Sequence, residues 1–192
     1  NGIKMSKSKG NVVSPDDLVR DYGCDSLRMY ELFVGPPELD AEWDDRGIDG
    51  VNRFLKRLWT LLMDSKDQEI KASKEMIKLR HRMVYDITTR LESFSLNTVI
   101  SGFMEYNNKF IELAKKEGGI DKETLETIAV LISPFAPHFA EEMWEQLGHT
   151  ETVFKAGWPA YDEEAMKDDE IQIPVQINGK TKAVVSISAE AS

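Results

Sequence analysis

The chain has 192 residues, a formal net charge of −10 and 30% charged residues, which is typical of a soluble globular protein. One cysteine excludes an internal disulfide, and three histidines beside it give no zinc-ligand spacing, so no metal site is predicted. No apolar run approaches the roughly 18 residues of a membrane span. We therefore expect a protein of the reducing cytoplasm with no membrane partner.

The negative charge is concentrated in one part of the chain. Residues 118–170 carry three basic and thirteen acidic groups, whereas residues 71–117 carry nine basic and six acidic groups. A net negative charge argues against a nucleic-acid partner, because phosphates repel an acidic surface. Since the charge is local, the composition does not exclude an RNA-binding face elsewhere on the chain.

Three lysines, two serines and a glycine lie close together in residues 4–10. Ammonium groups supply positive charge, hydroxyls supply hydrogen-bond donors, and Gly10 permits close approach of the backbone. This composition suits a clamp on a polyphosphate, and it is equally that of a solvated Lys/Ser loop. The following string Ser14-Pro15-Asp16-Asp17 predicts a helix start, and Gly23 predicts the end of that helix.

Helical periodicity predicts the fold of the central part of the chain. After a short helix that Asp25-Ser26 is placed to cap, Gly35-Pro36-Pro37 breaks the chain before an acidic connector. Four to five longer amphipathic helices with short connections then predict an antiparallel bundle. These helices run from Gly47 to about Met63, over roughly 73–92, and after Ser95, Asp121 and Pro137.

Basic side chains lie on the polar faces of the first two of these helices. Such side chains bind RNA backbone phosphates with salt-dependent affinity, although each is also typical of a solvated helix face. Arg80 instead falls toward the apolar side, so it needs a partner or a groove edge. The candidate RNA-binding residues are Arg53, Lys56, Arg57, Lys74, Lys78 and Arg82, together with Lys180 near a later turn.

The last part of the chain lacks the helical periodicity of the central part. After Trp158-Pro159 it is acidic and irregular, and from Ile171 onward the apolar period is two. Asn178-Gly179 is a strong hairpin-turn signal, and residues 183–187 supply the return strand. Two strands alone are marginally stable, so we expect the start of a truncated β unit.

Other conspicuous side chains are assigned to packing. Trp59 and Trp144 lie on apolar stripes and are expected in the core. His138 follows Pro137 at a helix start, which favours a capping or packing role. Cys24 is expected to be a small buried residue.

Several strings resemble, in order, those of class I aminoacyl-tRNA synthetases. Lys4-Met5-Ser6-Lys7-Ser8 matches the signature loop of this class, which holds the ATP phosphates during amino-acid activation. Residues 22–28 and 131–144 resemble segments shared by the leucyl, valyl, isoleucyl and methionyl group. Residues 42–59 and 175–180 are similar to the bacterial leucyl type in particular.

The resemblance implies a fold and a division of the chain. The fold is mainly α, with an antiparallel helical bundle of the class I anticodon-binding type over residues 36–160. Before it, residues 1–35 hold the signature loop and two short helices that end the catalytic domain. After it, residues 161–192 hold an acidic linker and a truncated β-hairpin that begins a C-terminal domain. We expect a C-terminal fragment of a longer enzyme, inactive in isolation.

The resemblance also implies an activity. The full-length enzyme would activate leucine with ATP to leucyl-adenylate, transfer the leucyl group to tRNA(Leu), and act as a monomer. Lys7 and Lys4 would be catalytic and would contact the ATP phosphates, with Ser6 and Ser8 donating to phosphate oxygens or holding the loop shape. Mg²⁺ would be bound largely by the part of the enzyme that lies outside this sequence.

Two alternatives stay open. The parent could be an isoleucyl- or valyl-tRNA synthetase, which aminoacylation with each amino acid would decide. The chain could also be a non-catalytic helical RNA-binding module in which the lysine loop is accidental.

Overall fold

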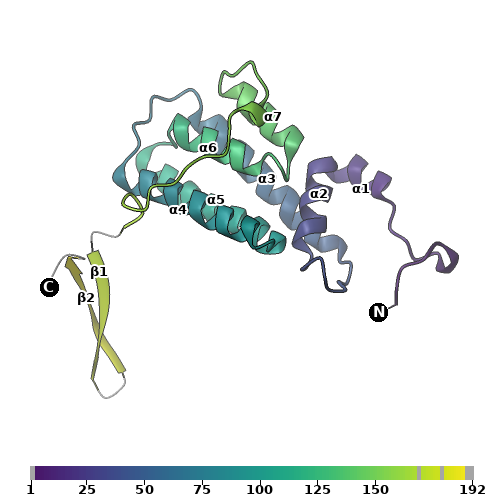
Figure 1. Ribbon diagram of the computed structural model, residues 1–192, viewed down its shortest axis with the longest axis horizontal. Helices are drawn as coiled ribbons and strands as arrows, with labels where there is room; N and C mark the ends of the chain where they lie inside the picture. Colours follow the sequence, from purple (N-terminus) through teal and green to yellow (C-terminus); the bar gives the residue numbers. More distant parts are fainter. Residues whose placement is uncertain (1–2, 168–169, 178–179, 189–192) are drawn as a thin grey trace.

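The computed structural model describes residues 3–167, 170–177 and 180–188, and most of these are helical (Figure 1). The expectation of a mainly α chain is confirmed. Across those ranges no helix combines the length and the apolar character that crossing a bilayer requires. The helices are α1 Pro15–Tyr22, α2 Cys24–Phe33, α3 Asp45–Ser65, α4 Lys74–Glu92, α5 Leu96–Glu117, α6 Lys122–Ile132 and α7 Pro137–Gln146, with short 3-10 turns η1 Lys7–Lys9 and η2 Val153–Lys155.

Helices α2 to α7 pack around one hydrophobic core. Helix α5 lies in contact with α2, α3 and α4, and α6 contacts α4 and α7. The apolar stripes predicted from the sequence face inward, as shown by the complete burial of Leu62 on α3, Ile87 on α4 and Phe110 on α5. Burial of such side chains provides the main driving force for packing these amphipathic helices together.

Helix α2 is joined to the start of α3 through the side chain of Tyr30. The Tyr30 hydroxyl donates to the backbone oxygen of Asp44 at 2.6 Å, and its ring meets the Trp43 ring edge to face. Asp44 caps α3 by accepting a hydrogen bond from the Arg46 backbone N–H at 3.0 Å. The acidic connector before α3 is therefore held against α2.

Helix α2 is also joined to α7, through a residue to which the sequence assigned another role. We expected Asp25 to cap its own helix, but α2 begins one residue earlier, at Cys24. The buried Asp25 carboxylate instead accepts a hydrogen bond from the Phe139 backbone N–H at 2.7 Å and lies 2.9 Å from His138 Nδ1. Asp25 thus satisfies an N–H group in the first turn of α7, where no local side chain caps the helix.

After α7 and η2 the described residues include two paired strands. Strand β1, Glu170–Ile177, pairs antiparallel with β2, Lys180–Ser188, and the register shifts between Val175 and Gln176. Pro174, which cannot donate a ladder hydrogen bond, is paired with Val184 and lies one residue before the shift. The turn predicted at Asn178-Gly179 lies outside the described residues, and so does the Lys180 side chain.

Candidate functional site

The lysine-rich loop near the start of the chain is shaped by its own side chains. The Asn11 side chain accepts a hydrogen bond from the Ser6 backbone N–H at 2.9 Å, and the Ser6 and Ser8 hydroxyl oxygens lie 3.2 Å apart. Gly10 adopts the left-handed region, with φ at 63°, and its N–H bonds to the Lys7 oxygen. Asn11 and the two serines therefore close a compact loop around η1.

The lysines of this loop point their charge at solvent. Lys4, Lys7 and Lys9 are exposed, and none of them has an ion pair within the described part of the chain. Figure 1 shows η1 extending beyond α1, away from the helical core. Lysine ammonium groups are compact, strongly hydrated charges with three donors each, so the loop offers cations to an incoming polyanion.

The base of the loop faces the acidic connector. Lys4 and Met5 line a hollow together with Asp40, Glu42 and Trp43. Met5 keeps 42% of its surface exposed. The hollow brings a cation of the loop together with two carboxylates of the connector.

Helix α3 presents a basic row to solvent. Arg53, Lys56 and Arg57 are exposed and lie within little more than one turn of the helix. Their side chains make no ion pair with any residue that the structure describes. This half of the predicted tRNA-binding set is therefore accessible to phosphates.

Helix α4, which carries the other half, is covered by a segment that we call the strap, residues 158–167. The strap is held to α4 by two aromatic side chains and by polar contacts of its backbone. The contacts are Trp158 Nε1 to Thr88 Oγ1 at 2.9 Å, Tyr161 against the Tyr85 ring at 5.1 Å between centroids, Asp162 N to His81 Nδ1 at 3.1 Å, and Arg82 Nε to the Met166 oxygen at 3.1 Å.

The strap binds one of the three candidates on α4, Arg82. The Arg82 guanidinium donates to the strap, and Lys74 and Lys78 also have interaction partners. Helices α3 and α4 each pack on α5, so the two basic groups belong to separate helices on the same core. The strap could not be predicted from the sequence, because nothing in the period of α4 marks which segment lies on its polar face.

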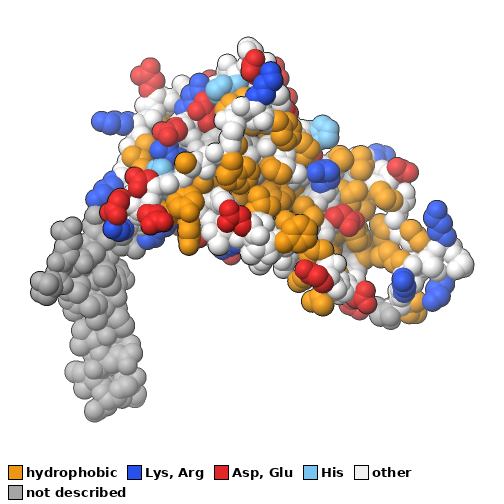
Figure 2. Space-filling view, in the orientation of Figure 1, with side chains coloured by type: hydrophobic (Ala, Val, Ile, Leu, Met, Phe, Trp, Pro, Cys, Tyr) orange, Lys and Arg blue, Asp and Glu red, His pale blue; other side chains and the backbone are white. Residues whose placement is uncertain are grey.

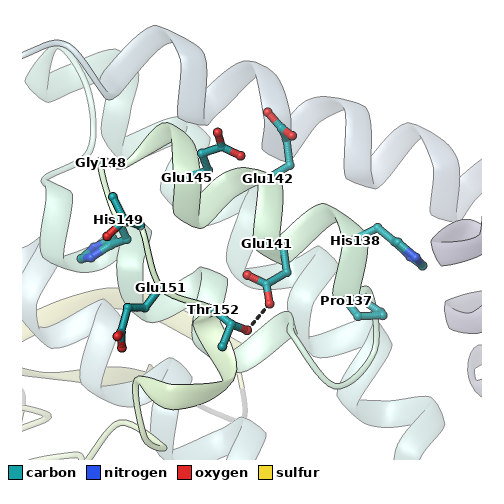
Figure 3. Close-up of a pocket in the computed structure, with 10 residues that line it drawn as sticks. Pro137, His138, Glu141, Glu142, Glu145, Gly148, His149, Glu151 and Thr152 are labelled. Atoms are coloured by element: carbon teal, nitrogen blue, oxygen red, sulfur yellow. Dashed lines mark hydrogen bonds between the residues drawn. The ribbon is translucent and has the colours of Figure 1, made fainter.

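A hollow beside α7 has the opposite charge (Figure 3). It is lined by Glu141, Glu142 and Glu145 of α7 and by Glu151 of the following loop. Glu141 is held by hydrogen bonds from the Thr152 hydroxyl and from the Val153 backbone N–H. Four carboxylates repel phosphates, so this hollow is not a candidate site for RNA. In the described residues, no His, Cys, Asp and Glu side chains are grouped to hold a metal ion.

The remaining predictions concern single side chains. Trp59 and Trp144 are half-buried against the core, as expected, and Trp144 stacks on His149 with centroids 3.7 Å apart. His138 lies 2.9 Å from Asp25 at the start of α7, but its side chain is 77% exposed, so it makes a polar contact at the surface and is not packed in the core. The expected burial of Cys24 is wrong: it is exposed, because the turn at Gly23 places it in a surface groove.

Comparison with known proteins gives two family matches. Residues 73–192 match the family described as the anticodon-binding domain of tRNA ligase. Residues 1–44 match the family described as tRNA synthetases class I (I, L, M and V). The two matches leave only residues 45–72 of the chain outside either family.

Individual relatives agree with these matches. The chain is 48% identical to the leucine–tRNA ligase of Fervidobacterium nodosum over 100% of its length, and 42% identical to that of Rhodopirellula baltica over 98%. It spans 25% and 20% of the length of these relatives. A solved structure described as the ternary complex of Agrobacterium radiobacter K84 agnB2 LeuRS, tRNA and LeuAMS covers the whole chain with a TM-score of 0.85 at 28% identity, over 26% of its own chain.

Proposed function

Because the chain belongs to the anticodon-binding-domain family of tRNA ligases, we propose that it works as part of a longer leucine–tRNA ligase. That ligase activates leucine with ATP to leucyl-adenylate and transfers the leucyl group to tRNA(Leu). The observation that carries the proposal is identity of 42–48% to leucine–tRNA ligases over essentially the whole chain. The ligase acts as a monomer in the cytoplasm.

In this proposal the signature loop binds the ATP phosphates. Lys7 stabilises the charge that develops around the α-phosphate while leucine attacks, and Lys4 is the supporting cation. Ser6 and Ser8 hold the loop shape and donate to phosphate oxygens, and Asn11 keeps the loop closed. The exposure of the lysines and the absence of ion pairs for them within the described chain support this role. Mg²⁺ and leucine are bound largely by other parts of the ligase.

Residues 36–160 form the antiparallel tRNA-binding bundle in this proposal. Residues 1–35 end the catalytic domain, and residues 161–192 form the linker and the start of a C-terminal β domain. The structural neighbour is a complex with tRNA and LeuAMS, which supports tRNA as the partner. Arg53, Lys56 and Arg57 are the phosphate contacts that the exposure of α3 supports best, since Lys74, Lys78 and Arg82 already have partners.

The test of the ATP role compares two lysines of the loop in the complete ligase. We expect Lys7→Ala to lower the kcat of ATP–pyrophosphate exchange about 10²- to 10³-fold, the usual effect of removing one charge-stabilising donor. Lys9→Ala is the matched control and should change kcat by less than about fivefold, because Lys9 is assigned no phosphate contact. A Lys7→Ala enzyme that keeps near-native kcat would refute the assignment.

A further inference from the structure

The middle of the strap is held to α4 through one nitrogen of a histidine side chain. The Asp162 backbone N–H donates to His81 Nδ1 at 3.1 Å. On either side of this bond, the side chains of Trp158 and Tyr161 and the backbone oxygen of Met166 also contact α4. Of these four contacts, only the one to His81 depends on a group that ordinarily changes its charge between about pH 5 and 8.

The hydrogen bond specifies the protonation state of His81. A backbone N–H only donates, so Nδ1 accepts with its lone pair, and the imidazole is neutral with its proton on Nε2. A protonated imidazole carries an N–H group at both ring nitrogens. Two donors would then face one another, and the Asp162 N–H would lose its acceptor.

The charged groups on the elements around His81 are engaged with one another or with water. On the strap, Asp162 Oδ1 accepts from the Glu164 N–H at 2.9 Å, and the Glu164 carboxylate lies 2.6 Å from Lys167 Nζ. The other groups are Lys78 and Arg82 of α4, which have partners, Glu123 of α6 beside Arg80, Glu126 of α6 beside His149 and Lys122, and Glu163 of the strap, which is exposed. Figure 2 shows acidic and basic side chains mixed at the end of the bundle where the strap runs. A protonated His81 would therefore have to draw a carboxylate away from its present contact, or from water, to gain an ion pair.

The docked strap limits the reach of the segment that leads to the strands. The strap is bonded to α4 from Trp158 to Met166, and β1 begins at Glu170. Fully extended, residues 158–167 would span about 33 Å, and docking on α4 withholds this length from the tether of β1.

We propose that His81 is the latch of a pH-sensitive strap. The neutral imidazole holds residues 158–167 on α4, and a proton taken up from solvent at Nδ1 favours their release and so lengthens the tether to β1. The latch consists of contacts within this chain, so it goes beyond the proposed function and does not depend on it.

Hydrogen exchange of the Asp162 amide tests the latch directly. The protection factor is the exchange rate of an unstructured peptide divided by the measured rate at the same pH. In the unaltered chain we expect it to fall about 3- to 10-fold at Asp162 from pH 8 to pH 5, the effect of losing one net hydrogen bond. The Ile120 amide is the internal control, because it donates at 3.1 Å to the Ser65 hydroxyl, which does not titrate in this range. Constant or rising protection at Asp162, or an equal fall at Ile120, would overturn the proposal.

Two histidine variants assign the pH response to one residue. In His81→Asn the side-chain oxygen is bonded to Cγ, as Nδ1 is in histidine, so it can accept the same hydrogen bond and does not titrate. Protection of the Asp162 amide should then be equal at pH 5 and pH 8. His138→Asn is the matched control and should keep the fall, because His138 lies beside Asp25 on α2. A fall that persists in His81→Asn, or disappears in His138→Asn, would contradict the latch. If His81→Asn does not fold, the pH series on the unaltered chain decides.

Trypsin cleavage distinguishes release of the strap from a change confined to Asp162. His81→Ala removes the acceptor at every pH, so at pH 8 cleavage after Lys167, at the end of the strap, should be about 3- to 10-fold faster than in His81→Asn. Cleavage after Lys155, which lies in η2 outside the strap, should proceed at the same rate in both variants. Equal rates at Lys167 would show that the bond to His81 does not hold the strap and would overturn the proposal.

Discussion

The guanidinium of Arg80 lies 3.3 Å from the carboxylate of Asp121, and both side chains are less than one tenth exposed. Asp121 is also the N-cap of α6, where it accepts hydrogen bonds from the Thr124 N–H and hydroxyl. The Arg80 guanidinium lies 3.0 Å from Glu123, which is exposed. The partner that the sequence required for Arg80 is therefore the cap of another helix, and it joins α4 to α6.

Removal of Asp121 should be costly for this reason. Asp121→Ala leaves a buried guanidinium without its buried partner and α6 without its cap, so we expect a loss of about 3–5 kcal/mol in the free energy of unfolding. Glu123→Ala removes only the exposed partner and should cost less than about 1 kcal/mol. Urea denaturation of the chain measures both, and equal losses for the two variants would contradict this account.

Two glycines of α3 should respond in opposite directions to alanine. A Cβ atom at Gly47 would lie 2.3 Å from the Tyr30 ring, so Gly47→Ala should destabilise the chain by about 1–3 kcal/mol. At Gly50 nothing lies within 4 Å of such an atom, and Gly50→Ala should stabilise the helix by about 0.5–1 kcal/mol. Thermal unfolding gives the sign of each change. A Gly47→Ala chain as stable as the unaltered one would mean that the Tyr30 ring is free to move.

Stability should depend on pH through Tyr106. Burial raises the pKa of the Tyr106 hydroxyl above its ordinary value, and the hydrogen bond to Asp86 raises it further. Because the pKa is higher in the folded chain than in the unfolded chain, the protonated Tyr106 hydroxyl stabilises the fold. This stabilisation is complete below about pH 10 and is lost as the pH rises further. We expect Tyr106→Phe to flatten the alkaline fall in the free energy of unfolding. Tyr161→Phe, at an exposed ring, should keep the fall, and the same curve for both variants would refute this role.

The two basic groups should differ in their effect on tRNA binding. Arg53→Glu with Arg57→Glu should lower the magnitude of the slope of log K against log salt by about 2, since each accessible contact releases about one counterion. Lys74→Glu with Lys78→Glu is a control of equal charge change, and it should alter the slope less because these lysines already have partners. Filter binding at several salt concentrations measures both slopes. The reverse order would contradict the assignment of the tRNA contacts to α3.

The features that were predicted correctly from the sequence are those set by residues close together in the chain. The helices, and the basic row on α3, follow from a period of 3.6, which is a local property of the chain. The start of α2 was misplaced because Asp25 finds its partner 114 residues away, at Phe139. A contact over that sequence separation leaves no local pattern. In the sequence, an aspartate that caps its own helix therefore cannot be told from one that bonds the first turn of α7.

The end of α4 was predicted near residue 92 and is observed at Glu92, although no glycine marks it. Phe94 adopts the left-handed region there, at φ 56°, where glycine is the usual residue, and the Ser95 N–H bonds to the Arg90 oxygen at 2.9 Å. The strap, in contrast, had no local signal. The strap was missed because Trp158 and Tyr161 lie in an irregular segment without a period, although their rings and backbone neighbours dock on α4. The accessible part of the candidate site was therefore smaller than the sequence indicated.

Aminoacylation of tRNA by the complete ligase, with leucine, isoleucine and valine compared at equal concentration, tests the central claim most directly. We predict efficient charging with leucine, and a kcat/KM for isoleucine and valine at least about 100-fold lower. Preferred charging with isoleucine or valine would contradict the assignment to leucine, and no charging with any of the three would contradict the proposed ligase function.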